Sequence, residues 1–298
     1  MHAPRPLVRA FSGPLYRVAL NHRTPPRIGR RVLHVAVPMH QLPRGTVVRR
    51  IELGGVPCER TTVGATDRPR AILYLHGGGY SVGSAKLFRA AAAHLAETAG
   101  AVVYNLDYRL APEHPFPAAW QDATAAFREL VAQHGYAPSD IAVAGDSAGG
   151  GLSVASARTL TDEGLRPGAI ALFSPWTDPS NEDFEVERDF VTNRPWGSAS
   201  AALYRGGADP KDARYAPMHG SLVGLPPMLI QYAAGEMLQP EIRRFAALAE
   251  AASVGVDLVE LPELWHSVIV LSGTLRGATD AAHEAGAWLR KQLDGPKN

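Results

Sequence analysis

The sequence predicts an α/β fold with a mostly parallel central sheet, flanked by helices and completed by a helical cap. From about residue 70 onward, short continuous apolar runs alternate with longer stretches of helical pattern, as in sheets covered on both faces. Gly-rich turns join several of these runs to the helix that follows. The chain has 298 residues, 46% of them hydrophobic and 20% charged, which suits one large globular domain with an insertion.

The elements follow one another in a regular order. Residues 47–53 and 56–63 flank Gly54-Gly55 and predict a leading hairpin. The apolar runs predict strands at 71–76, 101–106, 141–144, 169–174, 228–233 and 256–261. The stretches between and after them predict helices at 84–100, 117–134, 148–163, 239–254 and 274–293.

Two segments break this alternation and are predicted to form the cap. Residues 1–45 carry apolar side chains at helical spacing, interrupted by Gly13-Pro14. An insertion as long as residues 179–222 is usually a functional lid. The predicted organisation is cap over 1–45, core over 46–178, cap insertion over 179–222 and core over 223–298. We expect the two cap segments to share an apolar surface that includes Phe11, Leu15, Trp196 and Tyr204.

Charge and cysteine content limit the cellular locations and the partners that we expect for the protein. The net charge is +1, but residues 1–60 carry eleven Arg against two Glu. Such a segment can touch anionic lipid or nucleic acid; the favoured interpretation is that the Arg stems cover apolar surface. No apolar run is long enough for a membrane span, and residues 32–39 lie too late for a signal peptide. Only Cys58 is present, so no intramolecular disulfide can form and we expect a cytoplasmic protein. We also expect no stable membrane anchoring and no nucleic-acid partner.

The strongest chemical signal is Gly145-Asp146-Ser147-Ala148-Gly149, a G-x-S-x-G sequence between a predicted strand and a predicted helix. The glycines permit a sharp turn that projects the Ser147 hydroxyl above the sheet edge. A serine hydroxyl is a weak nucleophile, so it needs a base and donors for an oxyanion. The Ala148 N–H and the glycines of the HGGGY sequence at 76–80 can supply those donors. A phosphate-binding loop is disfavoured, because GGGYSVGSAK lacks the Gly-Lys-Ser/Thr ending.

The base and the acid should follow the serine in the order acid, then histidine. His266 lies on the loop after the last predicted strand, where an imidazole can reach the serine. Glu236 directly follows the preceding strand and is the favoured acid, with Glu241 as the alternative. Three other histidines fall in or beside helices, lack H-E-x-x-H spacing and are expected to be solvated: His94, His134 and His283.

Together these residues resemble the hormone-sensitive-lipase-like branch of the α/β-hydrolase fold, a group of bacterial carboxylesterases. The resemblance covers most of the chain from about residue 45. It rests on HGGGY at 76–80, DYRLAPEHPFPAAWQDA at 107–123, GDSAGG at 145–150, SPWTD at 174–178, GLPPMLIQ at 224–231 and WH at 265–266. Many members carry Asp-Pro-Leu where this chain has Glu236-Met237-Leu238, and a subset of the family uses Glu there.

The resemblance implies roles for particular residues. It implies catalysis by Ser147 and His266, with Glu236 as the acid. It implies an oxyanion hole formed by Gly77, Gly78 and Ala148. The predicted substrate-pocket residues are Tyr80, Trp176 and Asp178, and the predicted structural loop includes Asp107, Arg109, Glu113 and His114.

The predicted function is that of a serine carboxylesterase acting on a small ester with a short- to medium-chain acyl group, with no cofactor or metal. A deacetylase, amide hydrolase or lactonase would use the same residues and stays open. A ligand-binding receptor is disfavoured because His266 is present. Strand 256–261 is expected at the sheet edge, where it would pair with its twin in a homodimer.

Overall fold

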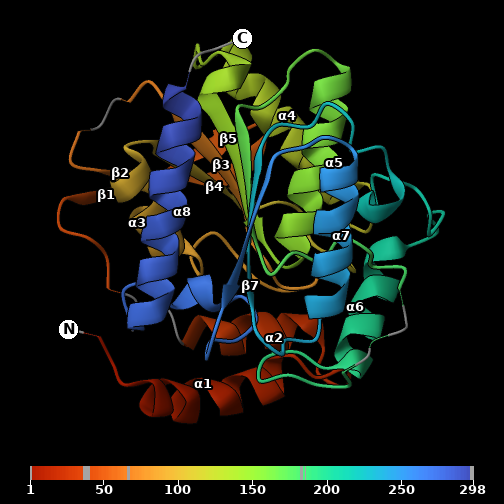
Figure 1. Ribbon diagram of the computed structural model, residues 1–298. Helices are drawn as coiled ribbons and strands as arrows, with labels where there is room; N and C mark the ends of the chain where they lie inside the picture. Colours follow the sequence, from red (N-terminus) through yellow and green to blue (C-terminus); the bar gives the residue numbers. More distant parts are fainter. Residues whose placement is uncertain (1, 36–40, 66–67, 182–183, 185, 296–298) are drawn as a thin grey trace.

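The computed structural model describes residues 2–35, 41–65, 68–181, 184 and 186–295, and their strands form a single sheet (Figure 1). The strand order is β1-β2-β4-β3-β5-β6-β7-β8. Within this sheet the pairings β1–β2 and β2–β4 are antiparallel, and the other five pairings are parallel. The strands are β1 Thr46–Leu53, β2 Val56–Val63, β3 Ala71–Leu75, β4 Val102–Leu106, β5 Ile141–Asp146, β6 Ala169–Phe173, β7 Met228–Ala233 and β8 Val256–Leu261. The predicted mostly parallel α/β fold is confirmed.

Helices cover both faces of the sheet, and the side chains of β3, which point alternately to the two faces, show how each face is packed. The covering helices are α3 Arg89–Ala99, α4 Ala118–Ala132, α5 Ala148–Asp162, α7 Gln239–Ala251 and α8 Arg276–Asp294. Leu73 and Leu75 pack with α4, α5 and α7, whereas Ile72 and Tyr74 pack with α3 and α8. All four side chains are fully buried, since a parallel strand between two helical layers has no solvent face. Short 3-10 turns are η2 Pro138–Asp140, η3 Pro217–His219 and η4 Val268–Leu271.

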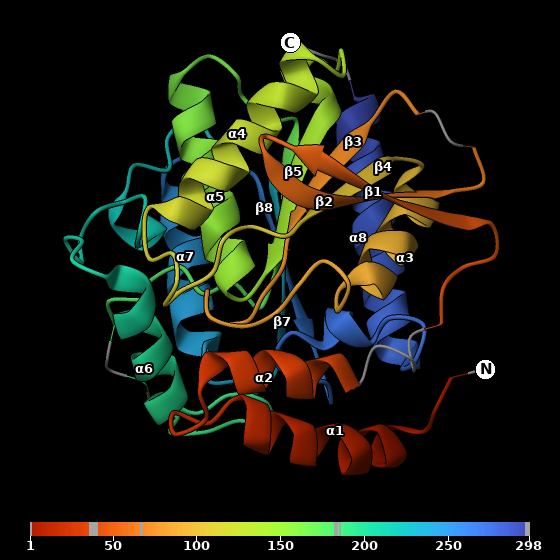
Figure 2. The same ribbon diagram turned by 180° about the vertical axis from the view of Figure 1, so that it is seen from behind.

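Three further helices lie near the carboxyl ends of the parallel strands, two of them below the sheet in Figure 1 and the third at its lower right (Figures 1 and 2). They are α1 Arg5–Ala19, α2 Pro26–Leu33 and α6 Arg194–Arg205. The first two come from the N-terminal segment and the third from the insertion at 179–222. Residues 1, 36–40, 182–183 and 185 of these predicted cap segments lie outside the described residues.

The N-terminal segment and the insertion contact each other directly. The Asn193 side chain donates a hydrogen bond to the Leu20 carbonyl at 2.9 Å. The Tyr16 and Phe190 rings meet edge to face with centroids 5.9 Å apart. The expectation for Tyr204 is wrong: its ring stacks on Tyr80, 3.6 Å away, in the core on the other side of the sheet.

The predicted interruption at Gly13-Pro14 is also wrong, because α1 runs through it. Proline removes one backbone donor, but tertiary packing of an apolar face can hold a helix despite that loss. The close approach of the Phe190 ring supplies such packing, since a Cβ on Gly13 would meet it at 3.4 Å.

Several arginines of the N-terminal segment have partners within the chain. The Arg9 guanidinium lies 4.3 Å from the centroid of the Phe190 ring, and Arg30 pairs with Glu113 at 2.8 Å. The Arg9 contact agrees with the interpretation that arginine covers apolar surface, whereas Arg30 is held by an ion pair. No helix in the described part of the chain combines the length and apolar character that a membrane span requires.

Candidate active site

Ser147 occupies the sharp turn between β5 and α5. Its backbone has φ 50° and ψ −121°, a conformation that side chains rarely adopt. The neighbouring glycines make the turn possible. A Cβ on Gly149 would lie 1.9 Å from the Leu75 carbonyl oxygen, and one on Gly145 would lie 2.3 Å from the Gly149 oxygen. The G-x-S-x-G spacing is therefore a steric requirement of this turn.

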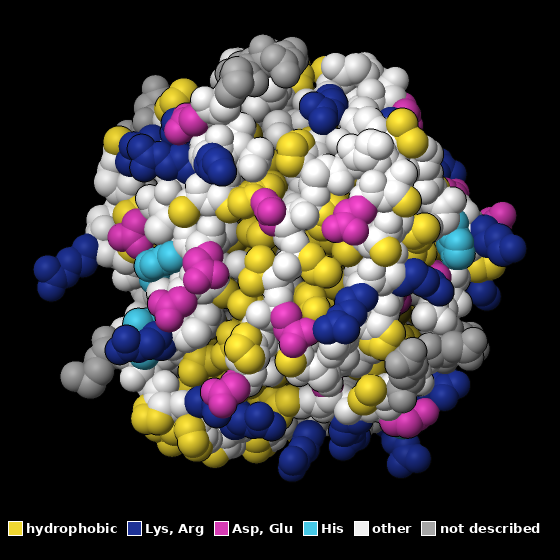
Figure 3. All heavy atoms as spheres, in the orientation of Figure 1, with side chains coloured by type: hydrophobic (Ala, Val, Ile, Leu, Met, Phe, Trp, Pro, Cys, Tyr) yellow, Lys and Arg dark blue, Asp and Glu magenta, His cyan; other side chains and the backbone are white. Residues whose placement is uncertain are grey.

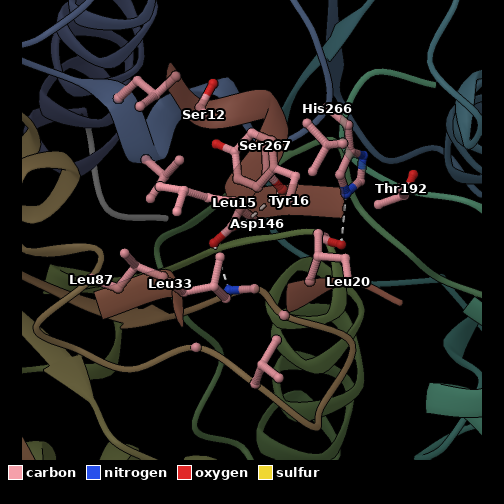
Figure 4. A pocket seen from close by; sticks show the side chains of 18 of the residues that line it. Ser12, Leu15, Tyr16, Leu20, Leu33, Leu87, Asp146, Thr192, His266 and Ser267 are labelled. Atoms are coloured by element: carbon pink, nitrogen blue, oxygen red, sulfur yellow. Dashed lines mark hydrogen bonds between the residues drawn. The ribbon is translucent and has the colours of Figure 1, made fainter. Parts of the chain in front are cut away.

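His266 and Glu236 lie beside the serine. The His266 Nε2 atom is 2.9 Å from Ser147 Oγ, and Figure 4 draws this contact as a dashed line. On the other side of the ring, His266 Nδ1 is 3.3 Å from Glu236 Oε2. All three side chains are buried. The predicted hydroxyl, imidazole and carboxylate groups thus lie next to one another in that order.

Glu241, the alternative acid, lies elsewhere. Its Oε1 atom accepts hydrogen bonds from the Thr177 and Asp178 backbone N–H groups, at 2.6 and 2.9 Å. Burial raises the pKa of Glu241 to about 7. This carboxylate fastens α7 to the segment after β6, and Glu236 alone of the two lies against His266.

The electrostatics of the site favour a basic imidazole. Burial alone would lower the pKa of His266, but the carboxylates of Glu236, Asp189 and Asp146 together outweigh it and raise that pKa above its usual value. Glu236 is held in turn by Ser174, whose Oγ donates to Oε2 at 2.7 Å. An acid placed in this way fixes the imidazole orientation and stabilises the imidazolium.

Sequence reasoning missed a second set of bonds, centred on the buried Asp146. Its carboxylate accepts hydrogen bonds from Gly77 N–H at 2.7 Å, Ser267 Oγ at 2.9 Å and Tyr74 Oη at 3.1 Å. Burial raises the pKa of Asp146 to about 7, although these donors act against the rise. The only sequence signal for this role is the place of Asp146 directly before the nucleophile, and nothing in the sequence pairs it with Ser267.

The Gly77 bond corrects the predicted oxyanion hole. A donor already bound to a buried carboxylate is not free for a substrate oxygen. Among the described hydrogen bonds, the N–H groups of Gly78, Gly79 and Ala148 have no protein acceptor. Ala148 is also the first residue of α5, so the positive end of the helix dipole lies at this point.

A cavity opens over Ser147 and is mostly apolar (Figure 4). Side chains of α1 and α2 form much of its wall, opposite the serine and the histidine. Its lining includes Val8, Phe11, Leu15, Tyr16, Leu20, Leu33, Val191, Trp196 and Val270. The cap helices therefore supply a surface suited to an apolar group bound next to the serine.

The predicted substrate-pocket residues lie outside this cavity. Tyr80 is buried under Tyr204, and Trp176 lines a separate hollow beside α6. The buried Asp178 accepts from Ser180 and lies 3.4 Å from His219. All three predictions are wrong for the cavity over Ser147, because the cap brings residues of α1 there instead.

The loop at 107–114 has a structural role, as the resemblance implied. Asp107 accepts the Ala85 N–H at 2.6 Å, where a turn over 84–88 delays the start of α3 to Arg89. Arg109 pairs with the buried Asp122 at 2.6 Å, and Glu113 pairs with Arg30 of α2. The pairing with Arg30 lowers the pKa of Glu113 to about 2. His114 is exposed, and its backbone N–H donates to the Leu110 carbonyl.

One of the histidines expected to be solvated is buried. His94 is only 7% exposed, because it packs between α3 and α8 and contacts His283. His283 is half-exposed, and His134 lies near Glu129 at 3.9 Å. The prediction of a solvated side chain is wrong for His94.

Fold and site together define an α/β hydrolase in which serine, histidine and glutamate side chains lie next to one another. Comparison with known families agrees: the family model of the α/β hydrolase fold matches residues 72–270. The chain belongs to this family and, within it, to the bacterial hormone-sensitive-lipase group of esterases.

Individual relatives are similar over most of their length. An acetyl-hydrolase of Streptomyces hygroscopicus is 38% identical over 252 residues, which cover 80% of this chain and 84% of the relative. The carboxylesterase NlhH of Mycobacterium tuberculosis is 35% identical over 239 residues, covering 76% and 75%. A crystal structure of an esterase from the bacterial hormone-sensitive lipase family superposes with a TM-score of 0.89 at 36% identity, covering 98% of this chain and 100% of the other.

Proposed function

We propose that this enzyme is a serine carboxylesterase that forms an acyl-enzyme on Ser147, with His266 as general base and acid and Glu236 as the orienting acid. The 2.9 Å contact between Ser147 Oγ and His266 Nε2 supports the proposal most directly. Two relatives named acetyl-hydrolase and carboxylesterase support it independently.

The proposed reaction has two stages. His266 removes the Ser147 proton as the hydroxyl attacks the ester carbonyl, and the N–H groups of Gly78, Gly79 and Ala148 bind the resulting oxyanion. The imidazolium then protonates the departing alcohol. In the second stage, His266 activates a water molecule that attacks the acyl-enzyme, and Ser147 is released with the carboxylic acid product.

The acyl group is proposed to be short to medium in length, of roughly two to eight carbons. Support comes from the apolar side chains of Leu15, Leu20 and Leu33, which line the same cavity as Ser147. Each bound methylene contributes about 0.8 kcal/mol until the space is full, after which longer chains have no room.

A second candidate is removal of an acetyl group from a larger metabolite. The similarity to an acetyl-hydrolase favours it, and the same residues would carry out either reaction. A panel of p-nitrophenyl esters from acetate to palmitate, assayed beside N-acetyl amides and lactones, separates the two. Highest kcat/KM on esters of two to eight carbons supports the carboxylesterase; activity on acetyl amides with weak ester hydrolysis would replace it by the deacetylase.

We also propose a homodimer that pairs β8 with its twin. β8 ends the sheet order, and Leu258 on this edge strand is 40% exposed. Light scattering at tens of micromolar tests the dimer, and a mass near the 31.8 kDa of a single chain would contradict it.

A cytoplasmic location is also proposed. The chain has a single cysteine, so its fold does not depend on an intramolecular disulfide and suits a reducing compartment.

A further inference from the structure

A second cluster of chemically active side chains lies where α3 packs against α8. His94 and Glu97 are one helical turn apart on α3, and both face His283 of α8. His94 Nδ1 is 2.9 Å from His283 Nε2. The Glu97 Oε2 atom is 3.5 Å from His283 Nε2 and 4.0 Å from His94 Nδ1. Two imidazole nitrogens and one carboxylate oxygen therefore converge on one point.

The spacing of these atoms suits a small metal ion. A tetrahedral Zn²⁺ with bonds of about 2.1 Å holds its ligand atoms about 3.4 Å apart. The three distances between the possible ligand atoms here, 2.9, 3.5 and 4.0 Å, lie on both sides of that value. Glu97 and His283 have side chains 41% and 38% exposed, so each is able to adjust by rotation about its side-chain bonds.

His94 is already oriented as a ligand. Its other ring nitrogen, Nε2, lies 3.3 Å from the Gln41 carbonyl oxygen, which only accepts hydrogen bonds. The proton therefore belongs on Nε2. The lone pair of Nδ1 then accepts a hydrogen bond from His283 Nε2, which a bound metal ion would replace. A backbone carbonyl behind a histidine is a common way for proteins to fix a metal-binding tautomer.

Burial favours the form of His94 that binds metal. Desolvation lowers the pKa of His94, and the neighbouring His283 acts in the same direction. A lower pKa favours the neutral imidazole, which is the form that binds a metal. Figure 3 shows His side chains beside Asp and Glu side chains on the face that α8 crosses, so solvent reaches this region.

We propose that His94, Glu97 and His283 bind a divalent transition-metal ion of the Zn²⁺ class and thereby join α3 to α8. Two imidazoles and a carboxylate favour Zn²⁺, Co²⁺ or Ni²⁺ over Mg²⁺ and Ca²⁺, which prefer oxygen ligands. Water completes the coordination on the exposed side. None of the three residues lines the cavity over Ser147.

The test uses full-length protein treated with chelator and then freed of it. Titration calorimetry with ZnCl₂ should give binding of one ion, and Co²⁺ should produce the visible absorption of a nitrogen- and oxygen-bound ion. At a free Zn²⁺ concentration about 100 times the Kd, the Tm should rise by about 5 °C, and equal MgCl₂ should leave it unchanged.

Variants separate this site from adventitious binding. His283→Gln and Glu97→Gln each should lower Zn²⁺ affinity at least about 10-fold and abolish the Tm shift, while p-nitrophenyl ester hydrolysis without metal stays unchanged. His134→Gln is the matched control, because His134 also lies near a glutamate but belongs to no group of three possible metal ligands among the described residues. Unchanged Zn²⁺ binding in both cluster variants, or no binding by the wild type, would overturn the proposal.

Discussion

Ser267 Oγ donates a hydrogen bond to Asp146 Oδ2 at 2.9 Å, joining the residue after His266 to the residue before Ser147. The two partners are 121 positions apart in the chain. The same carboxylate also holds the Gly77 N–H. One buried side chain thus links the serine turn, the histidine loop and the glycine segment beside the serine.

We predict that Ser267→Ala lowers kcat about 10-fold or more while KM changes little. Loss of this bond frees the histidine loop, and misplacement of a catalytic group by about 1 Å costs up to about 100-fold in rate. The measurement is kcat and KM with p-nitrophenyl butyrate, with circular dichroism to check folding. A wild-type kcat would show that the bond does not position His266.

Glu236→Gln is expected to reduce kcat at least about 100-fold, whereas Glu241→Gln retains most of it. Only Glu236 lies against His266, and a neutral amide does not stabilise the imidazolium. Glu241→Gln is a matched control, because it makes the same change at a buried carboxylate bonded to Thr177. Greater damage from the Glu241 variant would transfer the role of the acid to that residue.

The pH dependence of kcat/KM should report the environment of His266. The base must be neutral, so activity falls as the pH drops through its pKa. Because Glu236 raises that pKa, the midpoint of the acid limb should lie above the usual value of 6.5. Glu236→Gln should move the midpoint to lower pH, and Glu241→Gln should not. If the acid limb has the same midpoint in the wild type and in Glu236→Gln, a group other than His266 is titrating.

Chain-length preference should depend on α1. Leu15 lines the cavity together with Ser147, so Leu15→Trp fills part of the acyl space. We expect kcat/KM to fall at least about 10-fold for octanoate and to change less for acetate. Equal losses on both esters would mean that the acyl chain binds elsewhere, and faster turnover of palmitate than butyrate by the wild type would favour a lipase.

Local sequence was sufficient for the parts of the site that depend on backbone geometry. The glycines around Ser147 are required by one turn, and Glu236 and His266 follow predictable strands. The cavity wall was less predictable, because it depends on how the cap packs. Tyr204 and Phe190 are both aromatic residues of the insertion, yet only Phe190 meets α1, since Tyr204 lies on the α6 side that stacks on Tyr80. The hydrogen bonds of Ser174 and Ser267 were not predicted, because the sequence does not indicate which distant side chain a serine will bind.

The most direct test of the account is the rate of p-nitrophenyl butyrate hydrolysis by Ser147→Ala beside the wild type. The variant removes only the hydroxyl that lies 2.9 Å from His266, and it should fold normally by circular dichroism and thermal melting. We predict that kcat falls at least about 1,000-fold, as when a triad member is removed from a serine hydrolase. A folded Ser147→Ala protein with near-wild-type turnover would contradict the proposed mechanism.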